Sequence, residues 1–438
     1  MLDEIFDVFD VFGGAIGAVC DGVEFLADAA GLGSGGEGMS AFWDILFLPG
    51  DLAMWGYDGK AAKITLNRAE KQLAKRAGEF IREGGLVVLP TETVYGLGAD
   101  AFNSSAVARI YSEKGRPADN PLILHIAEAK DFDELVYEPP EYAARLIKAF
   151  WPGPLTLVAR KSPLLPFWAG GAPDGRTETI GIRMPAHPMA KAIIAAAGCA
   201  VAAPSANKAG RPSPTALAHI FEDYPELAGE MTEDEARNRG IMVIDGGNAL
   251  VGLESTVVDI TGERPRILRP GSITAENIQA VTKLDVDTTF PRNASVISGD
   301  SGDCPANQEN QSAPRSPGMK YKHYAPKAPL TILSGSSEKI AAYLESVASG
   351  TTEHDNSSRV GALVTEQTHR LIRGDIPMPV LTAGGDEQSI AQNLFARFRQ
   401  FDKAGVTQIY AESVPTTGIG AAIMNRMIKA AEGRVINV

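Results

Sequence analysis

The sequence predicts an α/β protein with two domains. Its 438 residues are too many for one average domain, and 44% of them are hydrophobic against 22% charged, which is typical of a globular chain. Short apolar runs typical of buried strands alternate with helical stretches along most of the chain. A polar stretch over residues 285–315, rich in Asp, Asn, Ser, Gly and Pro, separates a larger first part from a smaller second part.

Residues 1–60 differ from the rest in their charge. They hold eleven acidic residues and one basic residue, a net charge of −10, whereas the whole chain has −13. The remaining residues are therefore close to neutral, and overall acidity does not argue against nucleotide binding. We expect residues 1–60 to be an acidic, apolar extension of unknown role that lies outside the functional site.

The first domain is expected over residues 66–284. Apolar residues at helical spacing over 73–81 predict a helix, which Gly84 and Gly85 end. A loop is predicted at 90–97 and a second helix at 105–114. Buried strands are predicted at 86–89, 122–126, 179–184, 200–203, 241–245 and 255–260.

The second domain is expected over residues 327–438, with a Rossmann-like character. Its alternation of apolar runs predicts strands at 330–333, 360–364, 380–381, 408–412 and 435–438. Helices are predicted between them at 337–349, 389–401 and 421–431. Residues 285–326 are expected to be a flexible linker between the two domains.

The cysteines and histidines indicate the compartment and exclude some chemistry. Cys20, Cys199 and Cys304 are few and far apart, which argues against a disulfide framework and favours a reducing, cytoplasmic location. The sequence has no CxxC motif, and its six histidines are scattered, so we predict no metal-ligating residues. The longest apolar run, 192–203, is shorter than the roughly 20 residues of a membrane-spanning helix.

Cations and small polar residues cluster in two stretches of the first domain. Lys114 and Arg116 lie two residues apart on a Gly/Pro-constrained loop, which suits a polyanion such as a triphosphate. Ser205 and Asn207 follow the predicted strand 200–203, and open α/β sheets bind ligands at the carboxyl ends of their strands. Each stretch alone could be a solvated basic loop or ordinary turn chemistry.

An arginine inside a predicted strand is harder to explain structurally. Arg183 stands between apolar residues, where its charge needs a carboxylate or phosphate partner. The sequence shows no Ser–His–Asp set, no paired catalytic carboxylates and no P-loop. Cations with hydroxyl and amide groups are typical of positioning and charge neutralisation, as in nucleotidyl transfer.

The motifs resemble the YrdC-like L-threonylcarbamoyladenylate synthases, in the longer branch with two domains. The resemblance covers about residues 66–438. Lys114, Arg116, Ser205 and Asn207 match the KxR…SxN tetrad of that family. Further similar strings are PTETVYGLGADA (90–101), KGRPADNPLILH (114–125), WPGPLTLV (151–158), IGIRMPAHP (180–188), APSANKAGRPSPT (203–215), ESTVVD (254–259), ILRPGSI (267–273) and SPGMKYKHYAP (316–326).

The resemblance implies a fold, a reaction and partners. The fold would be a YrdC-like catalytic domain with a twisted open sheet, joined to the Rossmann-like domain by a linker that acts as a lid. L-threonine, bicarbonate and ATP would give L-threonylcarbamoyladenylate, pyrophosphate and water, with Mg²⁺ accompanying ATP. A downstream enzyme would then use the product to form N6-threonylcarbamoyladenosine beside the anticodon of tRNA.

The resemblance also implies residue roles. The catalytic tetrad would be Lys114, Arg116, Ser205 and Asn207. L-threonine would be bound by Thr93, His125, Arg183, Ser205 and Ser255, with Arg183 on its carboxylate. ATP would be bound by Lys114, Arg116, Asn120, Thr179, Asn207, Ser213, Thr215, Arg269 and, from the lid, Tyr324.

An RNA-binding module without synthase activity is the alternative. The family's domain presents a concave basic face that could contact RNA, and the near-neutral charge of the first domain neither supports nor excludes this. Consumption of threonine that depends on ATP and bicarbonate separates the two hypotheses.

Overall fold

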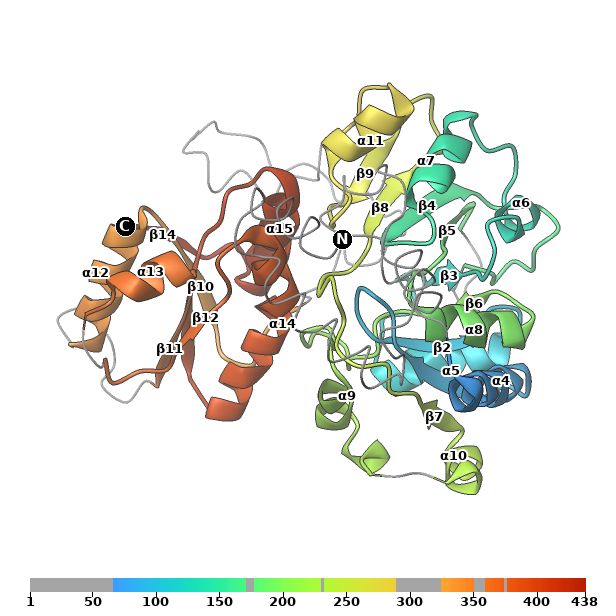
Figure 1. The fold of residues 1–438 in the computed structure, drawn as a ribbon, viewed down its shortest axis with the longest axis horizontal. Helices are drawn as coiled ribbons and strands as arrows, with labels where there is room; N and C mark the ends of the chain where they lie inside the picture. Colours follow the sequence, from blue (N-terminus) through green and yellow to red (C-terminus); the bar gives the residue numbers. More distant parts are fainter. Residues whose placement is uncertain (1–65, 171–176, 230–231, 289–323, 350–358, 374–375) are drawn as a thin grey trace, which may run out of the picture. The chain divides into compact units, whose positions relative to one another are not determined.

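The computed structural model describes residues 66–170, 177–229, 232–288, 324–349, 359–373 and 376–438 (Figure 1). The acidic extension and most of the expected linker, including residues 316–323 of the lid, lie outside these described residues. The described residues belong to one compact unit, 64–438.

A mixed sheet of nine strands forms the first part of the described chain, in the order β7-β1-β2-β6-β3-β5-β4-β8-β9 (Figure 1). The sheet combines parallel pairs such as β3 with β5 and antiparallel pairs such as β4 with β5. The strands are β1 (Leu86–Leu89), β2 (Gly96–Asp100), β3 (Ile123–His125), β4 (Leu155–Arg160), β5 (Thr179–Arg183), β6 (Val201–Ala202), β7 (Ile241–Val243), β8 (Thr256–Asp259) and β9 (Arg266–Arg269).

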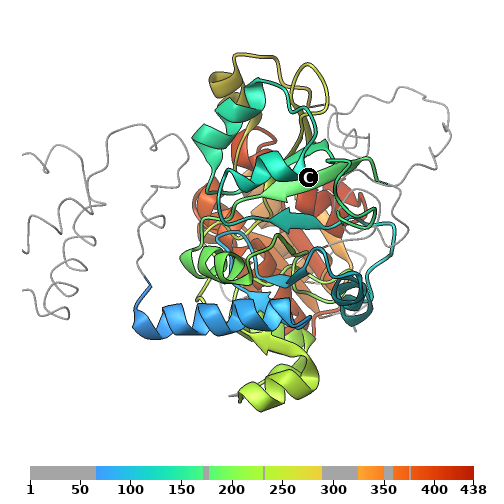
Figure 2. The same cartoon turned by 90° about the vertical axis from the view of Figure 1, so that its right-hand side faces the viewer.

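Helices α4 (Arg68–Arg82) and α8 (Pro188–Ala197) pack side by side (Figures 1 and 2). A capping box between Asn67 and Glu70 begins α4. Gly78 permits the close packing, because a Cβ there would lie 2.6 Å from the backbone of Ala196. The other helices of this part are α5 (Ser104–Lys114), α6 (Asp131–Leu135), α7 (Tyr142–Phe150), α9 (Leu217–Asp223), α10 (Glu233–Arg239) and α11 (Ala275–Thr282), with a 3₁₀ turn at Pro225–Leu227.

A parallel sheet of five strands forms the C-terminal domain, in the order β12-β11-β13-β10-β14. Helices α12 (Ser337–Ala348) and α13 (Glu366–Leu371) cover one face, and α14 (Glu387–Ala404) and α15 (Gly418–Ala430) cover the other (Figure 1). The strands are β10 (Leu330–Ser334), β11 (Val360–Val364), β12 (Val380–Thr382), β13 (Gln408–Glu412) and β14 (Val435–Asn437). The predicted α/β fold with a second, Rossmann-like domain is confirmed.

The sequence did not predict every element. The expected loop over 90–97 was wrong at its end, because β2 already begins at Gly96. The sequence of β2, Gly-Leu-Gly-Ala-Asp, is poor in residues that favour strands, so only its pairing with β1 and β6 defines it. Strands β4 and β9 and helix α13 were also not predicted.

Among the described residues, no helix is long and apolar enough to cross a membrane. The cytoplasmic location stays a prediction.

Candidate active site

A cavity of about 600 Å³, open solvent included, lies among the carboxyl ends of several strands and the loops that follow them. Eight of the residues singled out in the sequence line it: Thr93, Arg116, His125, Arg183, Ser205, Ser255, Arg269 and Tyr324.

Arg183, the last residue of β5, is held rigidly on one side of the cavity. Its Nη2 lies 2.6 Å from Oε1 of Glu92, and its Nη1 donates to Oγ1 of Thr93 at 2.8 Å. Its Nε donates to the carbonyl of Gly153 at 3.2 Å. Arg183 and Glu92 are almost fully buried, so this ion pair is shielded from water.

His125 ends β3 opposite Arg183, with which it is in register. Burial, together with the charge of Arg183, lowers the pKa of His125 to about 3, so the imidazole is neutral at physiological pH. No described residue hydrogen-bonds to its buried Nδ1. A neutral ring with an unpaired nitrogen can bind a polar ligand in the cavity.

Ser255 lies just before β8 and contacts residues of the two strands that flank β8, Thr156 of β4 and Arg269 of β9. Its hydroxyl lies 2.8 Å from Oγ1 of Thr156. Its carbonyl accepts hydrogen bonds from Nε and Nη2 of Arg269, at 3.1 and 3.0 Å.

Lys114 and Arg116 lie at the end of α5, where Gly115 adopts a left-handed conformation with φ 61°. The ammonium of Lys114 donates to the carbonyls of Ser205 and Asn207, which ties the two halves of the KxR…SxN pattern together. Arg116 donates to the carbonyl of Pro121 at 2.8 Å. Burial lowers the pKa of Lys114, and it lowers that of Arg116 to about 10. The latter remains cationic at neutral pH.

Ser205 and Asn207 contact each other through their side chains. The hydroxyl of Ser205 donates to Oδ1 of Asn207 at 2.6 Å. The amide of Asn207 donates to the carbonyls of Lys208 and Arg211. Asn207 therefore shapes the loop that follows β6, and Ser205 lines the cavity.

Six of the singled-out residues do not line this cavity: Lys114, Asn120, Thr179, Asn207, Ser213 and Thr215. Thr179 lines a neighbouring cavity, which shares Ile123 with the first one. Asn120 is buried beside Arg116, and neither polar atom of its side chain has a partner among the described residues. Leaving such atoms unpaired costs about 1–3 kcal/mol each.

Ser213 and Thr215 lie on the loop before α9. The hydroxyl of Ser213 donates to Oε1 of Glu254, and the backbone N–H of Thr215 donates to Nδ1 of His219 at 3.1 Å. Both residues are buried, so they shape the wall behind the cavity.

Tyr324, the first described residue after the linker, lines the cavity and stacks on Phe395 of α14 at a centroid distance of 5.5 Å. Its φ of 68° is left-handed, which is rare for a bulky residue. The following residue, Ala325, donates to the carbonyl of Gly210 at 3.1 Å and helps to hold this conformation. Tyr324 thus connects the catalytic and C-terminal domains at the cavity.

Comparison with known proteins identifies the family. The threonylcarbamoyl-AMP synthase of Bacillus subtilis is 42% identical over 375 residues, which are 85% of this chain and 96% of the relative. The chain belongs to the threonylcarbamoyl-AMP synthase family. A second family member, from Pyrococcus abyssi, is 40% identical over 85% of this chain and 97% of its own length.

Family models and a solved structure agree with this membership. The model described as "Telomere recombination", for Sua5, YciO and YrdC, matches residues 79–271. The model for the C-terminal domain of threonylcarbamoyl-AMP synthase matches residues 273–432. The crystal structure of P. abyssi Sua5 complexed with L-threonine matches with a TM-score of 0.69 and 38% identity, over 85% of this chain and 98% of that one.

Three charged residues near the cavity of this synthase-family chain were not predicted as site residues. Glu92 fixes Arg183, and Glu254 lines the cavity and is bound by Arg426 of α15. The two glutamates lie within the matched strings PTETVYG and ESTVVD. An acidic residue inside each of these motifs was therefore a signal that could have identified them as site residues. Nothing local in the sequence marks Arg426, because its partner is 172 residues away.

Proposed function

We propose that this chain synthesises L-threonylcarbamoyladenylate from L-threonine, bicarbonate and ATP and releases pyrophosphate. One observation carries the proposal: a single cavity brings Arg183, suited to a carboxylate, together with Arg116 and Arg269, suited to phosphates. Membership of the synthase family supports this, as does the existence of a family member's complex with L-threonine.

L-threonine is assigned to the side of the cavity around Arg183. The guanidinium, already oriented by Glu92, would bind the carboxylate of the amino acid. The hydroxyls of Thr93, Ser205 and Ser255 border the same space and can hydrogen-bond the amine and the hydroxyl of threonine. We call this region, with His125, the threonine side.

ATP is assigned to the opposite region, which we call the ATP side. The cations there are Lys114, Arg116 and Arg269, and Tyr324 covers it. The unpaired amide of Asn120 offers both a donor and an acceptor to the nucleotide. Asn207, Ser213 and Thr215 would fix the loop around the phosphates, and Thr179 would contact ATP only if the nucleotide reaches the neighbouring cavity.

The reaction joins the two sides. Bicarbonate takes up a proton and loses water to give CO₂. The neutral amine of threonine attacks the carbon of this CO₂ and loses a proton, which gives a carbamate and replaces the proton that bicarbonate took up. A carbamate oxygen then attacks the α-phosphorus of ATP, and the bond to the β-phosphate oxygen breaks to release pyrophosphate. The cations of the ATP side stabilise the charge that develops on the phosphates. His125 can accept a hydrogen bond, although a pKa of about 3 makes it a weak base.

Mg²⁺ is proposed to arrive with ATP and to offset the charge of its phosphates. The carboxylates beside the cavity, those of Glu92 and Glu254, are each ion-paired with an arginine. This donor set does not suit a protein-held metal, so we assign no protein ligand to Mg²⁺ and derive no step from it.

The linker is proposed to act as a lid that protects the product, a mixed anhydride, from water. The product is proposed to pass to a tRNA-modifying enzyme that forms N6-threonylcarbamoyladenosine beside the anticodon. A direct contact between this chain and RNA is proposed only in connection with this transfer of the product.

Pyrophosphate release by the purified chain tests the proposed function. It should require threonine, bicarbonate and ATP together, and mass spectrometry should detect threonylcarbamoyladenylate. Serine, which lacks the methyl group, should react more slowly. A chain that binds RNA but releases no pyrophosphate under these conditions would instead be the RNA-binding module.

A further inference from the structure

Glu254 lines the cavity and also contacts the C-terminal domain. One carboxylate oxygen, Oε1, accepts a hydrogen bond from the hydroxyl of Ser213. The other, Oε2, lies 2.9 Å from Nε of Arg426, which belongs to α15 of the C-terminal domain. The side chain of Arg426 is fully buried, and that of Glu254 is 8% exposed.

Arg426 reaches two further segments on the ATP side. Its Nη1 donates to the carbonyl of Pro270 at 2.7 Å, directly after Arg269. Its guanidinium also lies over the ring of Tyr324, 5.5 Å from the ring centroid. Arg426 therefore contacts the segments that carry Arg269 and Tyr324 directly. It reaches Ser213 through Glu254.

The charges at this point depend on each other. Burial alone would disfavour the charged form of Glu254, but Arg426 and Arg269 outweigh it and keep the pKa of this carboxyl below its usual value. Glu254 is therefore an anion that lines the cavity. Without Arg426, its negative charge would be poorly compensated next to the phosphates of ATP.

We propose that Arg426 is a positioning residue for ATP, through which the C-terminal domain takes part in the reaction. It orients Ser213, Arg269 and Tyr324 and neutralises Glu254, but it does not itself touch a reacting atom. This inference rests on the proposed function, since it assigns ATP to this side of the cavity. It gives the C-terminal domain a role beyond that of an anchor for the linker.

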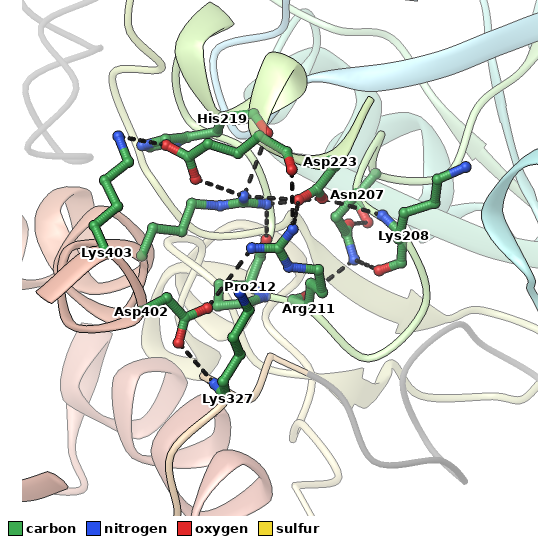
Figure 3. Close-up of polar contacts among 12 residues, drawn as sticks. Asn207, Lys208, Arg211, Pro212, His219, Asp223, Lys327, Asp402 and Lys403 are labelled. Atoms are coloured by element: carbon green, nitrogen blue, oxygen red, sulfur yellow. Dashed lines mark hydrogen bonds and ion pairs between the residues drawn. The ribbon is translucent and has the colours of Figure 1, made fainter. Parts of the chain in front are cut away.

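A second buried arginine, Arg399 of α14, provides a matched control. It is 1% exposed and forms two hydrogen bonds with the carboxylate of Asp223, at 2.9 and 3.0 Å. It also donates to the carbonyl of Pro212 at 2.6 Å. Figure 3 shows the surrounding cluster, in which Asp223 and Pro212 lie near Arg211, His219 and Lys403. Neither Arg399 nor Asp223 lines the cavity.

The two arginines thus join the same two domains, but only Arg426 contacts residues that line the cavity, Glu254 and Tyr324. Lysine at either position keeps a positive charge and loses the guanidinium's several donors. If both arginines were merely structural, the two lysine variants would have similar effects on activity. If Arg426 positions the residues of the ATP side, the two lysine variants should differ in their KM for ATP.

The experiment measures the KM for ATP, the KM for threonine and the melting temperature of the full chain with Arg426→Lys and with Arg399→Lys. Arg426→Lys should raise the KM for ATP about tenfold, the effect of losing a charge-assisted hydrogen bond. Its KM for threonine should change less than about twofold. Arg399→Lys should lower the melting temperature and leave both KM values within about twofold.

A double variant keeps the test informative if single variants unfold. Arg426→Met removes the cation paired with the Glu254 anion and leaves only Arg269 to compensate it, whereas Arg426→Met with Glu254→Gln removes both members of the pair. The double variant should therefore bind ATP more tightly than Arg426→Met alone. Equal changes in both KM values, or no rescue by the double variant, would overturn the proposal. Absence of pyrophosphate release by the unchanged chain would instead overturn the proposed function.

Discussion

The two sides of the cavity balance their buried charges in different ways. On the threonine side, Arg183 is matched by Glu92, and both residues belong to the catalytic domain. On the ATP side, Glu254 is matched by Arg426, which belongs to the C-terminal domain. The threonine side is therefore electrostatically complete within one domain, whereas the ATP side requires two. Changes in the C-terminal domain should affect ATP binding before they affect threonine binding.

The largest expected effect comes from Lys114. Lys114→Met removes the buried amino group of the ATP side and its hydrogen bonds to the carbonyls of Ser205 and Asn207. The rate of pyrophosphate release should fall about 10³-fold, since preorganised hydrogen-bond donors and dipoles dominate such transfers. The control is Lys208→Met, a lysine that contacts Tyr224 and Glu113 outside the cavity and should change the rate less than about threefold. Comparable losses in the two variants would refute the special role of Lys114.

The next largest effect concerns Tyr324. Tyr324→Ala removes the ring that stacks on Phe395 and lies under Arg426, so the KM for ATP should rise about tenfold. Tyr324→Phe keeps the ring and loses only the hydroxyl, which interacts with Arg269, so its effect should be smaller. Steady-state kinetics of both variants measures this. A larger change in the KM for threonine than in that for ATP would place Tyr324 on the wrong side of the cavity.

A smaller effect is expected at Thr179, in the neighbouring cavity. Thr179→Val keeps the shape and loses one neutral hydrogen bond, so it should raise the KM for ATP about threefold without changing that for threonine. This variant tests whether the ATP side extends into the neighbouring cavity. An unchanged KM for ATP would show that the nucleotide does not reach the neighbouring cavity.

A separate prediction concerns stability on the threonine side. His125 binds a proton with a pKa of about 3 in the folded chain and near 6.5 when unfolded, so the unfolded state takes up more protons between these values. As the pH falls from 6.5 toward 3, His125 should therefore destabilise the fold by up to about 1.4 kcal/mol per pH unit.

Denaturant unfolding at several pH values checks this contribution. The unfolding free energy of His125→Gln should depend less on pH below 6.5 than that of the unchanged chain. Parallel curves for the two chains would show that His125 does not titrate in this way.

The sequence predicted the local elements better than the long-range contacts. Runs of apolar residues predict buried strands such as β1 and β8, and apolar residues at helical spacing predict the long helix α14. Strand β2 has no such pattern, because its glycines are compatible with a loop and its pairing partner β6 is distant in the chain. Pairing across a sheet is a property of the fold rather than of a short window of sequence.

The same limit applies to the site. Arg183 and Ser205 are marked by their positions in and after predicted strands, the resemblance to a family adds a role for Arg269, and the structure brings these three residues to one cavity. The resemblance did not indicate that Glu254 is paired with Arg426, because no motif spans two domains. Motifs thus pointed to the cavity lining, whereas the charges that balance it became visible only in the fold.

The most direct test of the division between the two sides compares Arg183→Lys with Arg269→Lys. Arg183→Lys should raise the KM for threonine about tenfold and change that for ATP less than about twofold, because each lysine loses the paired donors of a guanidinium on one side only. Arg269→Lys should do the reverse. Equal shifts of both KM values in the two variants would contradict the separate binding of threonine and ATP.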